Sequence, residues 1–302
     1  MFLLSLFITI STAQPQMDDQ YEKAKVKFED AREKFNSARL KFDSAKDKLS
    51  RDELKNKTIE YLEKTIDYLV ALLEANKLRI ESSENRGILP FNASDSINIR
   101  IAQLEELRTK ILQANSPKES IKSARDLNDI AIKITLETRY YAGILNNRRN
   151  DLILGQADTV SARMEAEIQK LKEQDKDIKV DTEGEGFHLP LFYSTIVGNV
   201  GKGGPHLPFP YGFAPRLDEQ ASGFKNLLNE AKENHQKTLE LFSSHEGFDS
   251  NGLVTNNAKA RVFLDAASDL QKDTVKKLNA AGKQLRDFFK EIKKLNEVEK
   301  PQ

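Results

Sequence analysis

YEKAKVKFEDAREKFNSARLKFDSAKDKL, residues 21–49, decides the fold of this chain because it repeats every seven residues. One column of the repeat is aromatic and ends in leucine, and the column three residues later is alanine: Tyr21, Phe28, Phe35, Phe42 and Leu49; Ala24, Ala31, Ala38 and Ala45. Alternating steps of three and four predict a long helix that packs along one seam. Each alanine would let a neighbouring backbone approach, and each ring would fill the space beside it.

The columns on either side of this seam are basic. They hold Lys25, Arg32, Arg39 and Lys46 on one side, and Lys27, Lys34, Lys41 and Lys48 on the other. Two such helices in parallel would set like charges against each other at every flanking contact, which is unfavourable. We therefore expect the seam to pack against a different helix, either elsewhere in the chain or on a partner.

Helical spacing of apolar residues continues through most of the remaining chain. Ser116 with Glu119 is typical of a helix start, and Ser50 with Glu53 fits a capping box that favours either a new start or a bend in a continuing helix. The pattern predicts further helices at about 50–83, 94–111, 117–171, 217–245 and 256–299, with a bend in the third of these near Asn150 or Gly155. Nothing alternates with period two over a useful length. The predicted fold class is therefore all-α, an elongated helical bundle or antiparallel coiled coil.

Residues 181–216 interrupt this pattern with a stretch rich in glycine, proline and aromatic residues. The motif His-Leu-Pro-x-x-Tyr occurs there twice, eighteen residues apart. One hypothesis makes the two copies a partner-binding site, because aromatic side chains on a proline-stiffened loop suit recognition. The other makes the loop a cap over the end of the bundle. The candidate binding residues are His188, Phe192, Tyr193, His206, Phe209 and Tyr211.

The N-terminal residues MFLLSLFITISTA form an apolar run that ends in small residues. The run is too short to span a bilayer and is typical of a cleaved signal peptide, with Gln14 as the mature N-terminus. The alternative is an apolar tail docked on the bundle. We expect four segments: a signal peptide at 1–13, a long-helix coiled-coil region at 14–180, the loop insertion at 181–216, and a helical hairpin at 217–302 packing on the same bundle.

Composition narrows the classes of function. Lys and Arg together number 47, as do Asp and Glu, so the formal net charge is zero and a nucleic-acid partner is not expected. Cysteine is absent, which excludes disulfides and thiol chemistry. No other stretch of the sequence is long and apolar enough to span a membrane either. Asn56 and Asn92 begin Asn-x-Ser/Thr triplets and are glycosylation candidates in an exported chain.

Two patterns that resemble metal sites are interpreted as structural. The first consists of two histidines with two acids nearby in sequence, and it provides no defined set of zinc ligands: His188, His206, Glu183 and Glu185. If the chain were an enzyme that used either histidine, the purified protein would be expected to hold a metal. Residues 249–252, Asp-Ser-Asn-Gly, begin like a calcium loop, but a leucine follows where an oxygen ligand belongs, so we expect an ordinary turn.

Other polar groups also suggest no chemistry. The glycines around Lys202 match no phosphate-binding loop, and His235 and His245 are expected on a helix surface. We assign no catalytic residue, no metal and no cofactor, and we do not expect an enzyme.

Three stretches resemble a loosely defined set of uncharacterised, exported archaeal helical proteins. They are the heptads of 21–49, YLEKTIDYLVALLEANKLRIE at 61–81, and NDLILGQADTVSARMEAEIQKLKEQDKDI at 150–178. The resemblance implies an extracytoplasmic, elongated helical protein without an assigned activity.

These observations together predict a non-catalytic scaffold or interaction protein, secreted or associated with the cell surface. It would bind a protein partner, or self-associate, through its helical faces or the 181–216 loop. The alternative is a helical carrier of an apolar ligand, or a protein that binds a lipid surface. Balanced charge and the absence of tryptophan make a lipid surface the less favoured partner.

Overall fold

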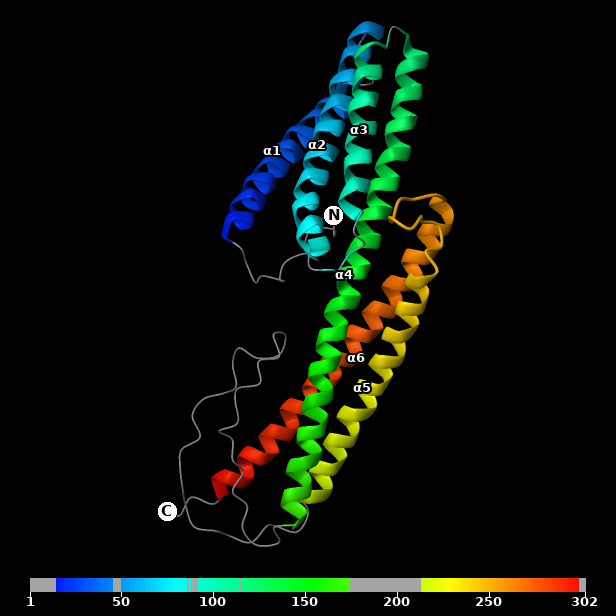
Figure 1. Ribbon diagram of the computed structural model, residues 1–302. Helices are drawn as coiled ribbons and strands as arrows, with labels where there is room; N and C mark the ends of the chain where they lie inside the picture. The colour runs from blue at the N-terminus through cyan, green and yellow to red at the C-terminus, as the bar shows by residue number, and fades with distance from the viewer. Residues whose placement is uncertain are drawn as a thin grey trace. The chain divides into compact units, whose positions relative to one another are not determined.

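In the computed structural model, the described residues are 15–45, 50–85, 87, 89, 92–114, 116–173 and 213–298. Within them the chain forms six helices (Figure 1): α1 (Pro15–Ala45), α2 (Arg51–Asn85), α3 (Ala93–Leu112), α4 (Pro117–Glu173), α5 (Phe213–Ser243) and α6 (Asn257–Val298). The described residues contain no strand, only a bridge between Phe248 and Val254. The all-α fold class is confirmed. The expected signal peptide and residues 181–212 of the expected insertion lie outside the described residues.

Two predicted helix starts are confirmed by their capping hydrogen bonds. The Ser50 N–H donates to Glu53 Oε2 at 3.1 Å, and the Glu53 N–H donates to Ser50 Oγ at 3.4 Å. Ser116 and Glu119 make the same reciprocal pair at 3.2 and 3.3 Å. Each pair satisfies backbone N–H groups that have no carbonyl acceptor within the helix, as occurs at the first turn of a helix. The capping bonds at Ser50 therefore mark the start of α2 as a separate helix.

The start of α5 and the course of α4 both differ from the prediction. α5 begins at Phe213, four residues before the predicted start at Leu217, and so includes Pro215. Proline is tolerated there because the first turn of a helix needs no backbone N–H from it. α4 continues as one helix through Asn150 and Gly155, near which a bend was expected.

The contacts divide the chain into two compact units. Unit 1 comprises residues 1–145 and 244–265, and unit 2 comprises residues 146–243 and 266–302. The divisions fall within α4, just after α5 and within α6, so each unit combines segments that are distant in sequence. In unit 1, α1, α2, α3 and the first part of α4 lie side by side (Figure 1).

The seam of α1 packs against α2 through a continuous stack of five rings. Phe28, Phe35 and Phe42 of α1 alternate with Tyr68 and Tyr61 of α2, with centroids 5.2–5.9 Å apart. These separations lie in the range that favours aromatic pairs. The ring order shows that the helices are antiparallel. The different helix that the basic flanks required is therefore α2 of the same chain.

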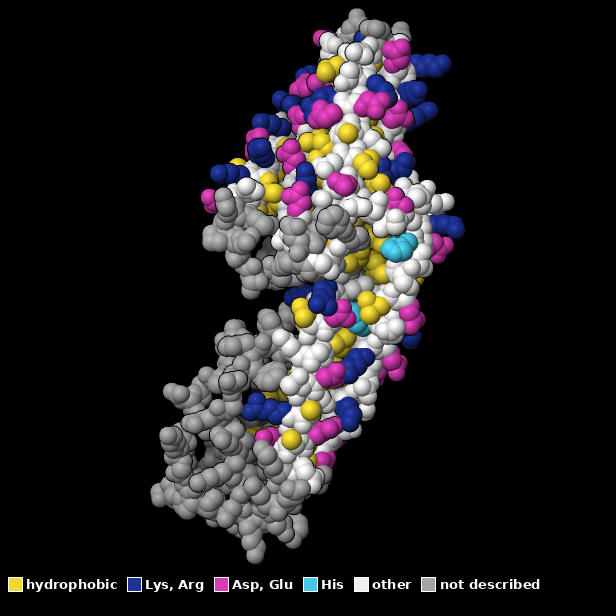
Figure 2. All heavy atoms as spheres, in the orientation of Figure 1, with side chains coloured by type: hydrophobic (Ala, Val, Ile, Leu, Met, Phe, Trp, Pro, Cys, Tyr) yellow, Lys and Arg dark blue, Asp and Glu magenta, His cyan; other side chains and the backbone are white. Residues whose placement is uncertain are grey.

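Four of the basic flanking residues of α1 are paired with acids on the same helix, and Figure 2 shows basic and acidic side chains interspersed where α1 lies. The pairs are Lys25–Glu22 at 3.4 Å, Arg32–Glu29 at 3.3 Å, Lys34–Asp30 at 2.6 Å and Arg39–Asp43 at 3.8 Å. Exposed pairs of this kind stabilise little individually. Their effect is to balance part of the positive charge on the flanks within α1 itself.

Unit 2 is built from the second part of α4, from α5, and from α6 beginning at residue 266. Its core contains fifteen buried hydrophobic residues: Ile153, Leu154, Ala157, Val160, Met164, Ile168, Leu217, Phe224, Leu228, Ala231, Leu278, Ala281, Leu285, Phe288 and Ile292. Ion pairs Asp158–Lys232 and Glu165–Lys225 show that α4 and α5 are antiparallel. Across both units, the described helices include none with an apolar stretch of membrane-spanning length.

Candidate functional site

The sequence-predicted binding residues His188, Phe192, Tyr193, His206, Phe209 and Tyr211 all lie outside the described residues. The two glycosylation candidates lie within them, and both are exposed. Asn56 is in the second turn of α2, whereas Asn92 immediately precedes α3 and makes no side-chain capping bond. Both amides are accessible on the folded chain.

A buried ion pair joins α3 to α4 in unit 1. The side chains of Arg100 and Glu137 are only 7% and 6% exposed. Arg100 Nε donates to Glu137 Oε2 at 2.9 Å, and Arg100 Nη2 donates to Glu137 Oε1. The same Oε1 accepts the Val254 N–H at 2.8 Å, so this pair also anchors residues 244–256, which we call the clasp loop. Both the guanidinium of Arg100 and the carboxylate of Glu137 therefore have hydrogen-bond partners, as a buried ion pair requires.

Two adjacent tyrosines of α4 hold the rest of the clasp loop. Tyr141 Oη donates to the carbonyl oxygen of Asn251 at 2.6 Å, and Tyr140 Oη lies 2.6 Å from His245 Nδ1. The Tyr140 ring stacks on Phe248 with centroids 4.4 Å apart. Burial raises the pKa of Tyr140 to about 12 and raises the pKa of Tyr141 as well. Both are neutral phenols at physiological pH that anchor the loop and do not act as bases.

The calcium-like motif lies in this loop and forms a turn. Asp249 Oδ1 accepts the N–H groups of Asn251 and Leu253 at 2.9 and 2.8 Å, so backbone donors use this carboxylate oxygen. Gly252 has φ of 82°, and a Cβ there would approach the Tyr140 and Tyr141 rings to 2.9 Å. The glycine is therefore required by the close approach of the loop to these two rings.

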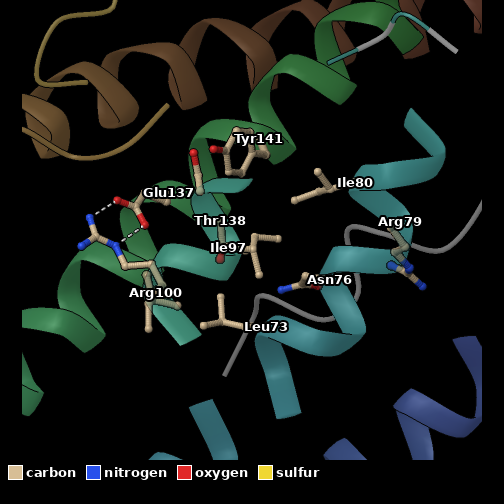
Figure 3. Close-up of a pocket in the computed structure, with 11 residues that line it drawn as sticks. Leu73, Asn76, Arg79, Ile80, Ile97, Arg100, Glu137, Thr138 and Tyr141 are labelled. Atoms are coloured by element: carbon tan, nitrogen blue, oxygen red, sulfur yellow. Dashed lines mark hydrogen bonds and ion pairs between the residues drawn. The ribbon is translucent and has the colours of Figure 1, made fainter. Parts of the chain in front are cut away.

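A small cavity lies among α2, α3 and α4 (Figure 3). Its volume is about 20 Å³, enough for one water molecule. Figure 3 shows Asn76 of α2 directed into it near Leu73 and Ile97. Asn76 Nδ2 is buried and makes no hydrogen bond within the described residues. A cavity of this size suits a single bridging water and gives no support to the carrier alternative.

In unit 2, a histidine that was predicted to lie on the surface is buried. His235 is 5% exposed, and its Nε2 lies 2.6 Å from Asp151 Oδ1 of α4. The surface prediction was wrong because His235 continues the buried stripe of α5: Leu228, Ala231, His235, Thr238 and Phe242. That spacing of three and four could have identified it.

The prediction for His245 also needs correction. His245 follows α5 in the clasp loop instead of lying on a helix, and it is half-buried against Tyr140.

The outward face of α1, opposite its seam, exposes aliphatic side chains. Val26 and Leu40 are 67% and 70% exposed and stand two heptads apart in one column, with Glu33 midway between them. Of the acids between them, Glu29 and Asp30 are paired, whereas Glu33 has no ion pair with any described residue. We define this column of Val26, Glu33 and Leu40 as the outer column. The sequence did not predict it because the heptad pattern identifies the seam but not whether another helix covers the opposite face.

Searches of protein-family models, curated proteins and solved structures found no match to the chain.

Proposed function

We propose that the chain is a non-catalytic, exported interaction protein that binds a protein partner through the outward face of α1. The observation that carries this proposal is the exposure of Val26 and Leu40 on a helix whose opposite seam is already packed against α2. Single exposed aliphatic residues are ordinary, but two in one column of a helical repeat offer a second helix two apolar contact points on the same face.

The polar clusters of the fold favour binding over catalysis. Arg100 and Glu137 bind each other and the clasp loop, Tyr141 holds a backbone carbonyl, and His235 lies against Asp151. Groups committed to packing contacts in this way are poorly placed to act on a substrate.

Export is supported by features outside the helical packing. The run at residues 1–13 has the apolar core and small terminal residues of a signal peptide. The exposed Asn56 and Asn92 would be available for glycosylation in an exported chain.

Affinity capture from host extract tests the proposal. The mature chain is compared with the double variant Val26→Glu/Leu40→Glu and with a control, Val262→Glu, which replaces a valine that is 71% exposed on α6 of the same unit. Partners are purified, and their affinity for each form is measured by calorimetry. We expect saturable binding to the wild type and to the control, and at least about a tenfold loss for the double variant.

Equal affinity in all three forms would contradict a role for α1. A variant lacking residues 184–211 then tests the loop hypothesis directly, after its helicity and cooperative melting are confirmed. Loss of binding in that variant alone would move the proposed site to the 181–216 segment.

A further inference from the structure

We infer that the partner of α1 is a helix that carries a lysine or arginine midway between two apolar residues spaced fourteen positions apart. This inference rests on the proposed function and specifies the partner of the same surface. It follows from the charge on the outer column rather than from its aliphatic side chains alone.

Glu33 differs from its acidic neighbours in lacking a close ion pair on α1, although its charge still interacts with that of Lys34. Glu29 lies 3.3 Å from Arg32, and Asp30 lies 2.6 Å from Lys34, so these acids are balanced within α1. Glu33 is exposed and has no ion pair with any residue in the described ranges. An acid at the centre of an apolar contact is stabilised by a cation on the partner, and it rejects a partner that presents another acid there.

The spacing of the column argues against a second copy of α1 as the occupant. Val26 and Leu40 each lie seven residues from Glu33. Antiparallel pairing of two outer columns would set Val26 against Leu40 but Glu33 against Glu33. Parallel pairing in register also sets Glu33 against itself. Like charges at the centre of either contact are unfavourable, so the surface fits a basic partner and not itself.

The required geometry of the partner can be stated. Fourteen residues of helix rise about 21 Å, so two apolar side chains at that separation would meet Val26 and Leu40 while a basic side chain meets Glu33.

The test uses two synthetic helical peptides as probes, each about 25 residues long and long enough to form a helix when bound. Both carry leucine at two positions fourteen apart with otherwise uncharged helix-forming residues. One has lysine midway, and the other has glutamate midway. Binding to the full chain is measured by fluorescence anisotropy for the wild type, Glu33→Lys, Glu29→Lys and the double variant Val26→Glu/Leu40→Glu.

We expect the wild type to bind the lysine peptide about tenfold or more tightly than the glutamate peptide. Glu33→Lys should reverse that preference. Glu29→Lys changes a neighbouring, paired acid by the same charge and should keep the original preference. The preference should also weaken as salt is raised, because a partly exposed ion pair is screened.

Three outcomes would overturn the inference. If Glu33→Lys binds both peptides as the wild type does, the charge assignment fails while the α1 surface stands. If Glu29→Lys reverses the preference equally, general charge and not Glu33 is responsible. If the wild type binds neither peptide, or the double variant binds as well as the wild type, the α1 surface itself is wrong and the proposed function fails with it.

Discussion

The α1–α2 seam and the core of unit 2 arise from the same kind of heptad patterning, yet they differ in how deeply they bury it. In unit 2, three helices contribute fifteen buried hydrophobic residues to one cluster. Along α1, the described hydrophobic residues that are buried are Phe28, Ala31 and Ala38, and the rings of Phe35 and Phe42 stay partly exposed.

The difference comes from the number of neighbours. A helix between two others buries a wide stripe, whereas a helix packed on one neighbour buries only its seam. Narrow burial leaves most of α1 facing solvent, and this is the condition under which one helix can both belong to the fold and offer a surface. The contrast predicts that substitutions in unit 2 will affect stability much more than equivalent substitutions along α1.

The largest effect is expected for Phe288→Ala in unit 2. Phe288 is 1% exposed, and its loss should cost about 3–5 kcal/mol of unfolding free energy because a large cavity forms in the core. The adjacent Phe289, 40% exposed, is the matched control, and Phe289→Ala should cost less than about 1 kcal/mol. Urea denaturation followed by circular dichroism measures both. A similar loss of unfolding free energy in the two variants would contradict the predicted contrast between buried and exposed positions.

An intermediate effect is expected at the polar position of the same core. Asp151→Ala leaves the buried His235 ring without its described partner and should cost about 1–3 kcal/mol. His235→Leu should cost less, because Asp151 is 39% exposed and can be hydrated. The exposed pair Asp158–Lys232 is the control, and Asp158→Ala should change stability by less than about 0.5 kcal/mol. Equal losses for Asp151→Ala and His235→Leu would contradict this account.

A smaller effect is expected for Phe35→Ala in the α1 seam. Phe35 stacks between Tyr61 and Tyr68, so the variant interrupts the ring stack and should cost about 1–2 kcal/mol. Amide hydrogen exchange should accelerate mainly within residues 19–44. Leu40→Ala, on the exposed face of the same helix, is the control and should leave exchange unchanged. An equal acceleration throughout unit 2 would show that α1 is no more weakly held than the core.

The smallest effect concerns the acid sensitivity of the α2–α3 contact. Burial raises the pKa of Asp67, but hydrogen bonds from Lys64 and Arg108 outweigh it and lower the pKa overall. Because the folded pKa is lowered, this stabilisation is present above the unfolded value near 3.8 and is lost as pH falls through the folded pKa. Asp67→Asn should therefore reduce the loss of stability between pH 5 and pH 2 by about 0.5 kcal/mol.

Thermal melts across that range test the acid effect, with the exposed Asp126→Asn as control. If the stability of Asp67→Asn depends on pH as that of the wild type does, Asp67 does not contribute to the acid sensitivity.

Features whose signals are local could be predicted from the sequence. The heptads of 21–49 predicted a seam that needs a different helix, and Ser50 with Glu53 predicted the start of α2. The spacing of Asn76 from Leu69, Leu73 and Ile80 is typical of the buried face of a helix, but its missing hydrogen bond can be recognised only once three helices enclose it.

Features that depend on distant segments could not be predicted. Glu137 and Val254 are 117 residues apart, and neither has a sequence neighbour that suggests the other. His235 was misassigned because residue type was given more weight than its spacing from Ala231 and Thr238. The outer column was missed for a different reason: the heptad pattern identifies the buried seam of α1 but does not show whether another helix covers the opposite face.

The bond from the Val254 amide to Glu137 has a consequence for how unit 1 folds. A contact over 117 residues can close only after the chain has passed through α5, so this bond, like those from Tyr141 and Ser96 to Asn251, adds to the contact order of the protein. We expect it to form late, after the hairpins that need only local loops. The Val254 amide proton should then report the completed unit: it becomes protected in refolding only when the clasp loop has docked, and its exchange in the native state measures how often that loop is released.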